Sequence, residues 1–139
     1  MTEKTMDDVW MELKEQFPID EIVKFSEFNI SEKLMENTWQ LTKFTELYQK
    51  EAEELNRIMA LKDKIIGMRY DFYRFNYDKE LRQSEIEKYY LPKDEKIIKI
   101  NKIIRQQQWR VEFFSMCVKA IDKVQWNMKN FNDNIKMGR

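Results

Sequence analysis

Helix-breaking residues are almost absent from this chain. Its 139 residues include only two prolines, Pro18 and Pro92, and two glycines, Gly67 and Gly138. Proline removes a backbone hydrogen bond from a helix and glycine adds the largest conformational entropy cost, so long stretches without either favour uninterrupted helices. Apolar residues recur at steps of three and four through most of the sequence. We therefore expect a mostly α-helical protein built from long helices.

The N-terminal part of the chain predicts three helical segments. Apolar residues between Met6 and Phe17 fall on one helix face, and Pro18 ends that helix. Asp20 is the expected N-cap of a short second segment, because its carboxylate can accept hydrogen bonds from first-turn amides. Ser31 is a comparable start signal for a third helix, whose apolar pattern continues to about residue 65.

The stretch 66–80 is rich in aromatic residues and has no clear periodicity. Aromatic density favours β-structure, but the alternation breaks at Phe72 and Tyr73. We expect a connector with short β pieces. Ser84 and Glu87 then form a capping-box signature for a brief helix that Pro92 ends.

The longest uninterrupted pattern follows Pro92. It predicts a helix over roughly 94–137 that stops at Gly138 and forms a helical hairpin with the helix starting near Ser31. Its apolar stripe is wider than one intramolecular contact can cover, which predicts self-association. The residues expected at the subunit contacts are Val111, Phe114, Val118, Ile121, Val124 and Met128.

The composition excludes several classes of enzyme. Without histidine, the chain cannot build Ser-His-Asp or Cys-His nucleophilic systems or histidine-containing zinc sites. Two glycines are too few for a glycine-rich phosphate loop, and carboxylate pairs such as Asp94-Glu95 are interpreted as solvated helix charges. Cys117 lies on an apolar helix face and is expected to be a buried structural thiol. We predict a protein that is not an enzyme and has no metal or cofactor.

The sequence also carries no signal for a membrane. No apolar run reaches the roughly 20 residues of a transmembrane helix, and the N-terminus lacks a hydrophobic signal core. We expect a soluble, intracellular protein without a membrane partner.

The net charge of zero conceals a split along the chain. Residues 1–56 carry 14 acidic and 6 basic residues, a balance of −8, whereas residues 57–139 carry 11 acidic and 19 basic ones, a balance of +8. A basic half of this kind is typical of proteins with an anionic partner such as nucleic acid. The alternative is that the two halves neutralise each other, within a hairpin or between subunits. Composition alone leaves both open.

Two groups of residues form the candidate nucleic-acid site. The first combines cations with flat rings, which single-stranded nucleic acid needs for its phosphates and unstacked bases. Its members are Lys62, Lys64, Arg69, Tyr70, Tyr73 and Arg74. The second is a slowly drifting stripe of basic residues on the C-terminal helix, with no acidic residue among them. It comprises Lys96, Lys99 and Lys102, continued by Arg105 and Arg110. The alternatives are aromatic packing in a core and a basic face that is solvated or paired with acids.

The order of these segments, from about Asp7 to Gly138, resembles the UvsY recombination mediator family of T4-like bacteriophages. The resemblance rests on collinear short motifs: Ile19-Asp20, Trp39, Ala60-Leu61-Lys62-Asp63-Lys64, Ser84-Glu85-Ile86, the stretch 94–100, Trp109 and Ala120-Ile121. It implies a protein without catalytic activity that binds single-stranded DNA as a ring-like homo-oligomer of about six or seven subunits. It also implies contacts with a UvsX-type recombinase and the phage single-stranded DNA-binding protein, in the cytoplasm of the bacterial host.

By this resemblance, Lys62 and Lys64 correspond to two basic DNA-contacting residues of the family. Lysine stands at position 64 where the family pattern has arginine, whose bidentate fork lysine lacks. The run from Arg69 to Tyr77 replaces a glycine-rich loop, so the resemblance implies no DNA role for it.

The expected function is a phage recombination mediator that loads the recombinase in place of the single-stranded DNA-binding protein. Residues 1–92 are then an N-terminal helical and DNA-binding region, and residues 93–139 a C-terminal oligomerisation helix, within one structural unit. The alternative is a non-enzymatic coiled-coil structural or adaptor protein that does not bind nucleic acid.

Overall fold

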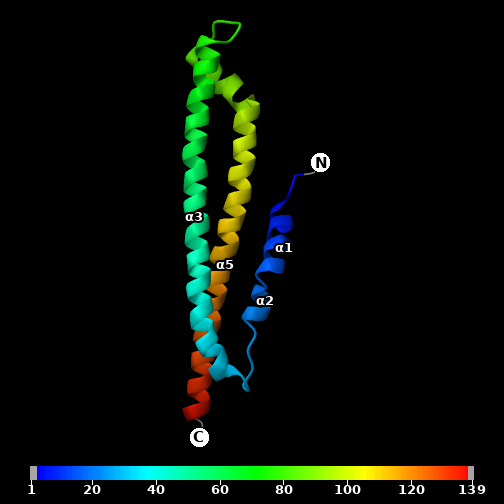
Figure 1. Ribbon diagram of the computed structural model, residues 1–139, viewed down its shortest axis with the longest axis vertical. Coiled ribbons are helices and arrows are strands. Elements are labelled where there is room, and N and C mark those ends of the chain that lie inside the picture. The colour runs from blue at the N-terminus through cyan, green and yellow to red at the C-terminus, as the bar shows by residue number, and fades with distance from the viewer. Residues whose placement is uncertain (1–2, 138–139) are drawn as a thin grey trace. The chain divides into compact units, whose positions relative to one another are not determined.

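Helices account for most of the described chain. A computed structural model describes residues 3–137, apart from the side chain of Lys136. Its elements in chain order are α1 (Met6–Gln16), α2 (Ile19–Ile22), α3 (Ile30–Phe75), α4 (Gln83–Glu85), the π-helical segment η1 (Ile86–Tyr90), the 3₁₀ segment η2 (Leu91–Lys93) and α5 (Glu95–Met137) (Figure 1). The mostly α-helical class is confirmed, and residues 3–137 contain no β-strand. The predicted stop at Gly138 lies outside the described residues.

Local capping sets the first two helices. Thr5 Oγ1 accepts a hydrogen bond from the Asp8 amide (3.2 Å), and the Asp8 carboxylate accepts one from the Thr5 amide (3.0 Å), which closes a capping box at the start of α1. α1 ends before Phe17 and Pro18, as predicted. The prediction that Asp20 caps α2 is wrong, because Pro18 occupies the N-cap and Asp20 lies in the first turn. A first-turn acid still complements the helix dipole.

Helix α3 extends beyond its predicted limits. It begins at Ile30, so Ser31 lies in its first turn rather than at the cap, and it continues through Gly67 to Phe75. The expected connector with short β pieces is therefore wrong over 66–75. Gly67 does not end the helix, because one glycine within a helix costs only about 1 kcal/mol. The space around it is open, since a side chain added there would meet nothing within 4 Å. Tyr70 and Tyr73, three residues apart, pack in one small core, and this burial outweighs the strand preference of aromatic residues.

Residues 76–82 and three short segments connect α3 to α5. The predicted capping box of Ser84 and Glu87 is wrong: α4 begins one residue before Ser84, and Glu85 accepts the hydrogen bond from the Arg82 amide (3.3 Å). Pro92 lies within η2, immediately before α5. The predicted start of the last helix near residue 94 is confirmed.

The chain divides into two compact units. Unit 1 is Met1–Ala52 with Trp109–Arg139, and unit 2 is Glu53–Gln108. Each unit contains a stretch of α3 and a stretch of α5, so the division crosses both long helices and does not fall at residue 92. The different roles assigned to 1–92 and 93–139 stay predictions.

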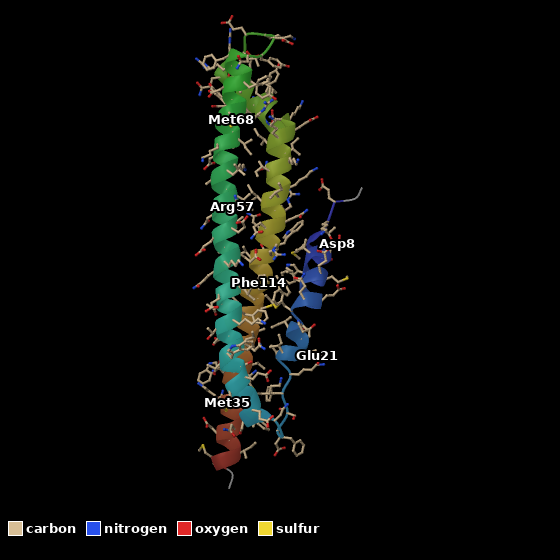
Figure 2. The ribbon with its side chains drawn as sticks, viewed as in Figure 1. Asp8, Glu21, Met35, Arg57, Met68 and Phe114 are labelled. Carbon is tan, nitrogen blue, oxygen red and sulfur yellow. The ribbon has the colours of Figure 1, made fainter. Side chains whose placement is uncertain are left out.

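Unit 1 has a core built from α1, α2, α3 and α5, and α1 and α2 lie beside the orange stretch of α5 in Figure 1. The Trp10 ring meets Phe113 edge to face (centroids 5.8 Å apart), and its indole N–H donates to the Trp109 carbonyl (3.0 Å). Phe17 meets Phe114, labelled in Figure 2, in the same way at 5.3 Å. The buried members of this core are Val9, Leu13, Ile19, Phe44, Phe113, Phe114, Cys117 and Ile121. Cys117 is buried, as predicted.

Two polar contacts in unit 1 join α3 to α5. The buried Asn37 side chain donates to the Ile121 carbonyl (3.1 Å). Arg110 donates two hydrogen bonds to the Glu51 carboxylate (2.6 and 3.2 Å). Glu51 belongs to the acidic half of the sequence and Arg110 to the basic half. Neutralisation between the halves therefore occurs at this pair.

Unit 2 contains two smaller cores. In the first, Ile58 of α3 packs with Ile100 and Ile104 of α5, flanked by Leu55 and Ile65. In the second, the buried residues Tyr73, Leu81 and Ile86 join the end of α3 to the connecting segments. The two arms of a helical hairpin therefore pack against each other within this unit, as predicted.

Candidate nucleic-acid interface

Asp94 is the centre of a buried hydrogen-bond network in unit 2. One carboxylate oxygen accepts from Arg69 Nε (2.7 Å) and the Tyr73 hydroxyl (2.6 Å), both on α3. The other oxygen accepts from the amides of Lys96 (2.9 Å) and Ile97 (3.2 Å), in the first turn of α5. The Asp94 side chain is 2% exposed and the Arg69 side chain 20%. The carboxylate therefore caps α5 and ties it to the end of α3.

The electrostatics of this network follow from its burial. Burial alone would raise the pKa of Asp94, but the hydrogen bonds from Tyr73 and Arg69 outweigh it and hold that pKa below its ordinary value. Burial and the hydrogen bond to Asp94 raise the pKa of Tyr73. The interpretation of Asp94 as a solvated helix charge is therefore wrong. Asp94 directly precedes the last helix, and this N-cap position could have been recognised in the sequence.

Arg69 and Tyr73 are engaged inside the chain. Besides its bond to Asp94, the Arg69 guanidinium lies 4.4 Å from the centroid of the Phe72 ring, and Tyr73 is buried. Arg69 and Tyr73 therefore take part in packing within the chain, and their contact with DNA stays a prediction. Arg74 differs from them because it is exposed, and it donates a hydrogen bond to the hydroxyl of the half-buried Tyr70 (3.2 Å).

Lys62 and Lys64 lie in the middle of α3, in unit 2. Lys64 is exposed and Lys62 is half-buried. The spacing places Lys62 on the helix face that carries Ile58 and Ile65, where a lysine can lay its aliphatic stem along the apolar core and keep its ammonium in water. Neither lysine forms an ion pair with any other residue of 3–137.

The basic stripe of α5 also belongs to unit 2, except for its last member. Lys96, Lys99, Lys102 and Arg105 are all exposed. Arg110 belongs to unit 1, and its charge is neutralised because it binds Glu51. Unit 2 thus contains all nine predicted DNA-contacting residues. Among them, Arg69 and Tyr73 bind Asp94, and Tyr70 packs against the same small core as Tyr73.

The connecting segments contribute a pocket that the sequence pattern did not indicate. Five aromatic rings line a cavity of about 530 Å³, namely Phe72, Tyr73, Tyr77, Tyr89 and Tyr90. Its charged lining residues are Glu85 and Lys93. Tyr89 and Tyr90 come from the π-helical segment, where they had no recognisable motif. Their closeness to residues 69–77 arises only because the chain reverses direction here.

The six residues predicted at subunit contacts fall into two groups in unit 1. Phe114, Ile121 and Met128 are buried within the single chain. Val111, Val118 and Val124 are half-buried, and Val111 lines an open groove of about 700 Å³ on α5 together with Met116 and Ala120. The width of the apolar stripe is explained in part by α1 and α2, which cover one side of it.

The described residues contain neither a cluster suited to a metal ion nor a membrane-spanning helix. Within residues 3–137, no three histidine, cysteine, aspartate or glutamate side chains lie close enough together to hold a metal ion. None of the helices described there is long and apolar enough to cross a membrane.

A comparison with known protein families identifies the family of the chain. The profile described as "Recombination, repair and ssDNA binding protein UvsY" matches residues 12–139. The chain belongs to the UvsY family. The comparison with curated proteins found no match.

Solved structures of a UvsY protein share the fold. One crystal structure of the bacteriophage T4 recombination mediator protein UvsY (lattice type IV) superposes with a TM-score of 0.77 at 18% identity, covering 94% of this chain and 98% of that chain. A second (lattice type II) gives a TM-score of 0.77 at 19% identity, covering 92% and 96%. At this identity the likeness establishes the fold alone.

Proposed function

We propose that this protein binds single-stranded DNA through unit 2 and acts as a recombination mediator in phage-infected bacterial cytoplasm. In that role it promotes loading of a UvsX-type recombinase in place of the phage single-stranded DNA-binding protein. Membership of the UvsY family supports the mediator role. No step of the proposal requires catalysis, a metal or a cofactor.

The observation that carries the proposal is the set of basic side chains in unit 2 that are not neutralised. Lys62, Lys64, Lys96 and Lys99 form no ion pair with other residues of 3–137. The stretch 96–110 contains no acidic residue. Lysines arranged in this way repel one another unless an anion lies along them, and a DNA strand supplies a regular series of phosphates.

Self-assembly would multiply this surface. We propose a ring-like homo-oligomer of about six or seven subunits, in which weak binding by each subunit adds up to strong avidity for one flexible strand. Val111, Val118 and Val124 remain the candidates for the subunit contacts, because they are half-buried in the single chain. Wrapping the strand on such a ring would weaken its hold on the single-stranded DNA-binding protein and present it to the recombinase.

Binding to a fluorescent dT oligonucleotide over a range of salt concentrations tests the proposal. The logarithm of the affinity should fall linearly with the logarithm of the salt concentration. In the double variant Lys62→Ala/Lys64→Ala, the slope should be shallower by about 1.4, since each neutralised phosphate of a single strand contributes about 0.7. The matched control Lys14→Ala/Lys24→Ala removes two exposed lysines of unit 1 and should keep the slope.

An oligonucleotide that does not bind even at low salt would contradict the proposal. That result would favour the coiled-coil structural or adaptor protein. The mediator step has its own readout: ATP hydrolysis by the recombinase on DNA already coated with the single-stranded DNA-binding protein. The wild-type protein should shorten the lag before hydrolysis begins, and the Lys62→Ala/Lys64→Ala variant should lengthen it again.

A further inference from the structure

The aromatic pocket at the α3–α5 connection has the features of a binding site for a flat ligand. Its rings come from three separate segments: Phe72 and Tyr73 from α3, Tyr77 from the loop after it, and Tyr89 and Tyr90 from η1. At about 530 Å³, the pocket is within the size range of ligand sites in proteins.

The floor of this pocket is fixed by packing. Tyr73 is buried, its hydroxyl is bound to Asp94, and its ring lies 5.4 Å from both Tyr77 and Tyr90. Tyr77 and Tyr90 are 5.3 Å apart. Rings held in this way lose little further freedom when a ligand arrives, which favours binding.

The mouth of the pocket is formed by its two most exposed rings. Tyr89 is 54% exposed and Tyr77 37%. Tyr89 makes no ring–ring contact with the rest of 3–137, although the Lys88 ammonium lies 5.7 Å from its centroid. An exposed tyrosine ring with a cation beside it suits stacking of a flat, neutral ring that has an anionic group attached to it.

The charges of the pocket indicate the orientation of its ligand. The ionised Glu85 carboxylate can only accept hydrogen bonds, so it disfavours a phosphate inside the pocket and favours an N–H edge. Every DNA base carries at least one N–H donor on its pairing edge. Lys93 lines this pocket and also a neighbouring cavity of about 270 Å³, whose other charged lining residues are Lys96, Glu95 and the paired Arg69 and Asp94. A phosphate is therefore best accommodated at the side of Lys93 and Lys96.

We propose that this pocket receives one unstacked base of single-stranded DNA, with Tyr89 and Tyr77 as stacking surfaces and Lys93 beside the adjoining phosphate. The inference rests on the proposed function and extends it. The lysines on α3 and α5 attract the backbone, and the pocket adds a contact that requires the base itself. Because every base has a flat face, the contact is independent of sequence.

The experiment compares two short fluorescent strands of equal length, one of dT and one of abasic deoxyribose phosphate. The wild-type protein should bind dT about 10-fold more tightly. Tyr89→Ala should lose most of this preference while the salt slope stays unchanged, because no charge is removed. Tyr89→Phe keeps the ring and should retain the preference. Phe75→Ala, which removes a 70% exposed ring outside the pocket lining, is the matched control and should also retain it.

The outcomes separate this inference from the proposed function. If the wild-type protein binds both strands equally, with a normal salt slope, the base pocket is wrong and the DNA-binding function stands. Equal losses in Tyr89→Ala and Phe75→Ala would also overturn the pocket. If neither strand binds at low salt, both proposals fail. Circular dichroism of each variant establishes that its helices are intact.

Discussion

Replacement of Asp94 should measure how strongly the start of α5 is tied to the end of α3. The carboxylate accepts four hydrogen bonds, two from α3 side chains and two from α5 amides. Asp94→Ala removes both acceptor oxygens and therefore all four hydrogen bonds. Asp94→Asn keeps a side-chain oxygen for the N-cap but removes the charge that pairs with Arg69. The two variants therefore separate capping from ion pairing.

The magnitudes follow from the burial of the partners. Breaking a buried ion pair from one side costs about 3–5 kcal/mol, and the low end applies because Arg69 remains 20% exposed to water. Loss of the N-cap adds about 1 kcal/mol. We expect Asp94→Ala to lower the free energy of unfolding by about 4 kcal/mol and Asp94→Asn by about 1–2 kcal/mol.

Urea unfolding followed by circular dichroism, at one fixed protein concentration, measures these differences. The reasoning would be refuted if Asp94→Ala cost less than about 1 kcal/mol, or if both variants cost the same. As a control, Asp63→Ala removes an exposed acid on α3 that forms no ion pair within 3–137, and it should change stability by less than about 0.5 kcal/mol.

Three further predictions concern pH, the thiol and assembly. The pKa of Asp94 is lowered, so the stability that its carboxylate contributes is fully present above its unfolded pKa near 3.8 and is lost as pH falls through the folded pKa. In acid unfolding curves, the stability gap between wild type and Asp94→Asn should therefore be constant from pH 7 to about 4 and shrink at lower pH. Burial raises the pKa of Cys117 to about 12, so a thiol reagent at pH 8 should label it only after denaturation, and rapid labelling of the native protein would contradict this. Val124→Glu should lower the assembled mass in light scattering and keep the helical circular dichroism signal. Ile121→Glu should instead unfold the chain, because Ile121 is fully buried. A native mass that Val124→Glu leaves unchanged would exclude this subunit contact.

The helical framework could be predicted because its signals are local. Pro18 and Pro92 mark two of its interruptions, and the apolar spacing continues through both long helices. The prediction for 66–75 was wrong because aromatic residues favour strands on average, whereas here they pack against residues 81–91, which follow the reversal of the chain. A propensity averaged over many proteins contains no information about such a partner.

The exposure of the candidate cations could be predicted, because a charged side chain loses its hydration when it is buried. Their role in DNA binding stays a prediction. Lys62 is half-buried, and Lys64, Lys96 and Lys99 are exposed. The hydrogen bonds of Arg69 and Tyr73 depend on Asp94, which is more than 20 residues away in the sequence. The pocket of Tyr77 and Tyr89 likewise forms only when the chain turns back on itself. Contacts at such separations are set by the tertiary fold.

Photocrosslinking tests the central claim most directly. A single strand carrying 5-iodouracil would be bound to the wild-type protein and irradiated, and the modified peptides identified by mass spectrometry. We expect crosslinks within unit 2, in the peptides that contain residues 62–77, at and just after the end of α3, and residues 88–102, around the start of α5. Crosslinks confined to unit 1, on α1, α2 or the C-terminal part of α5, would contradict it.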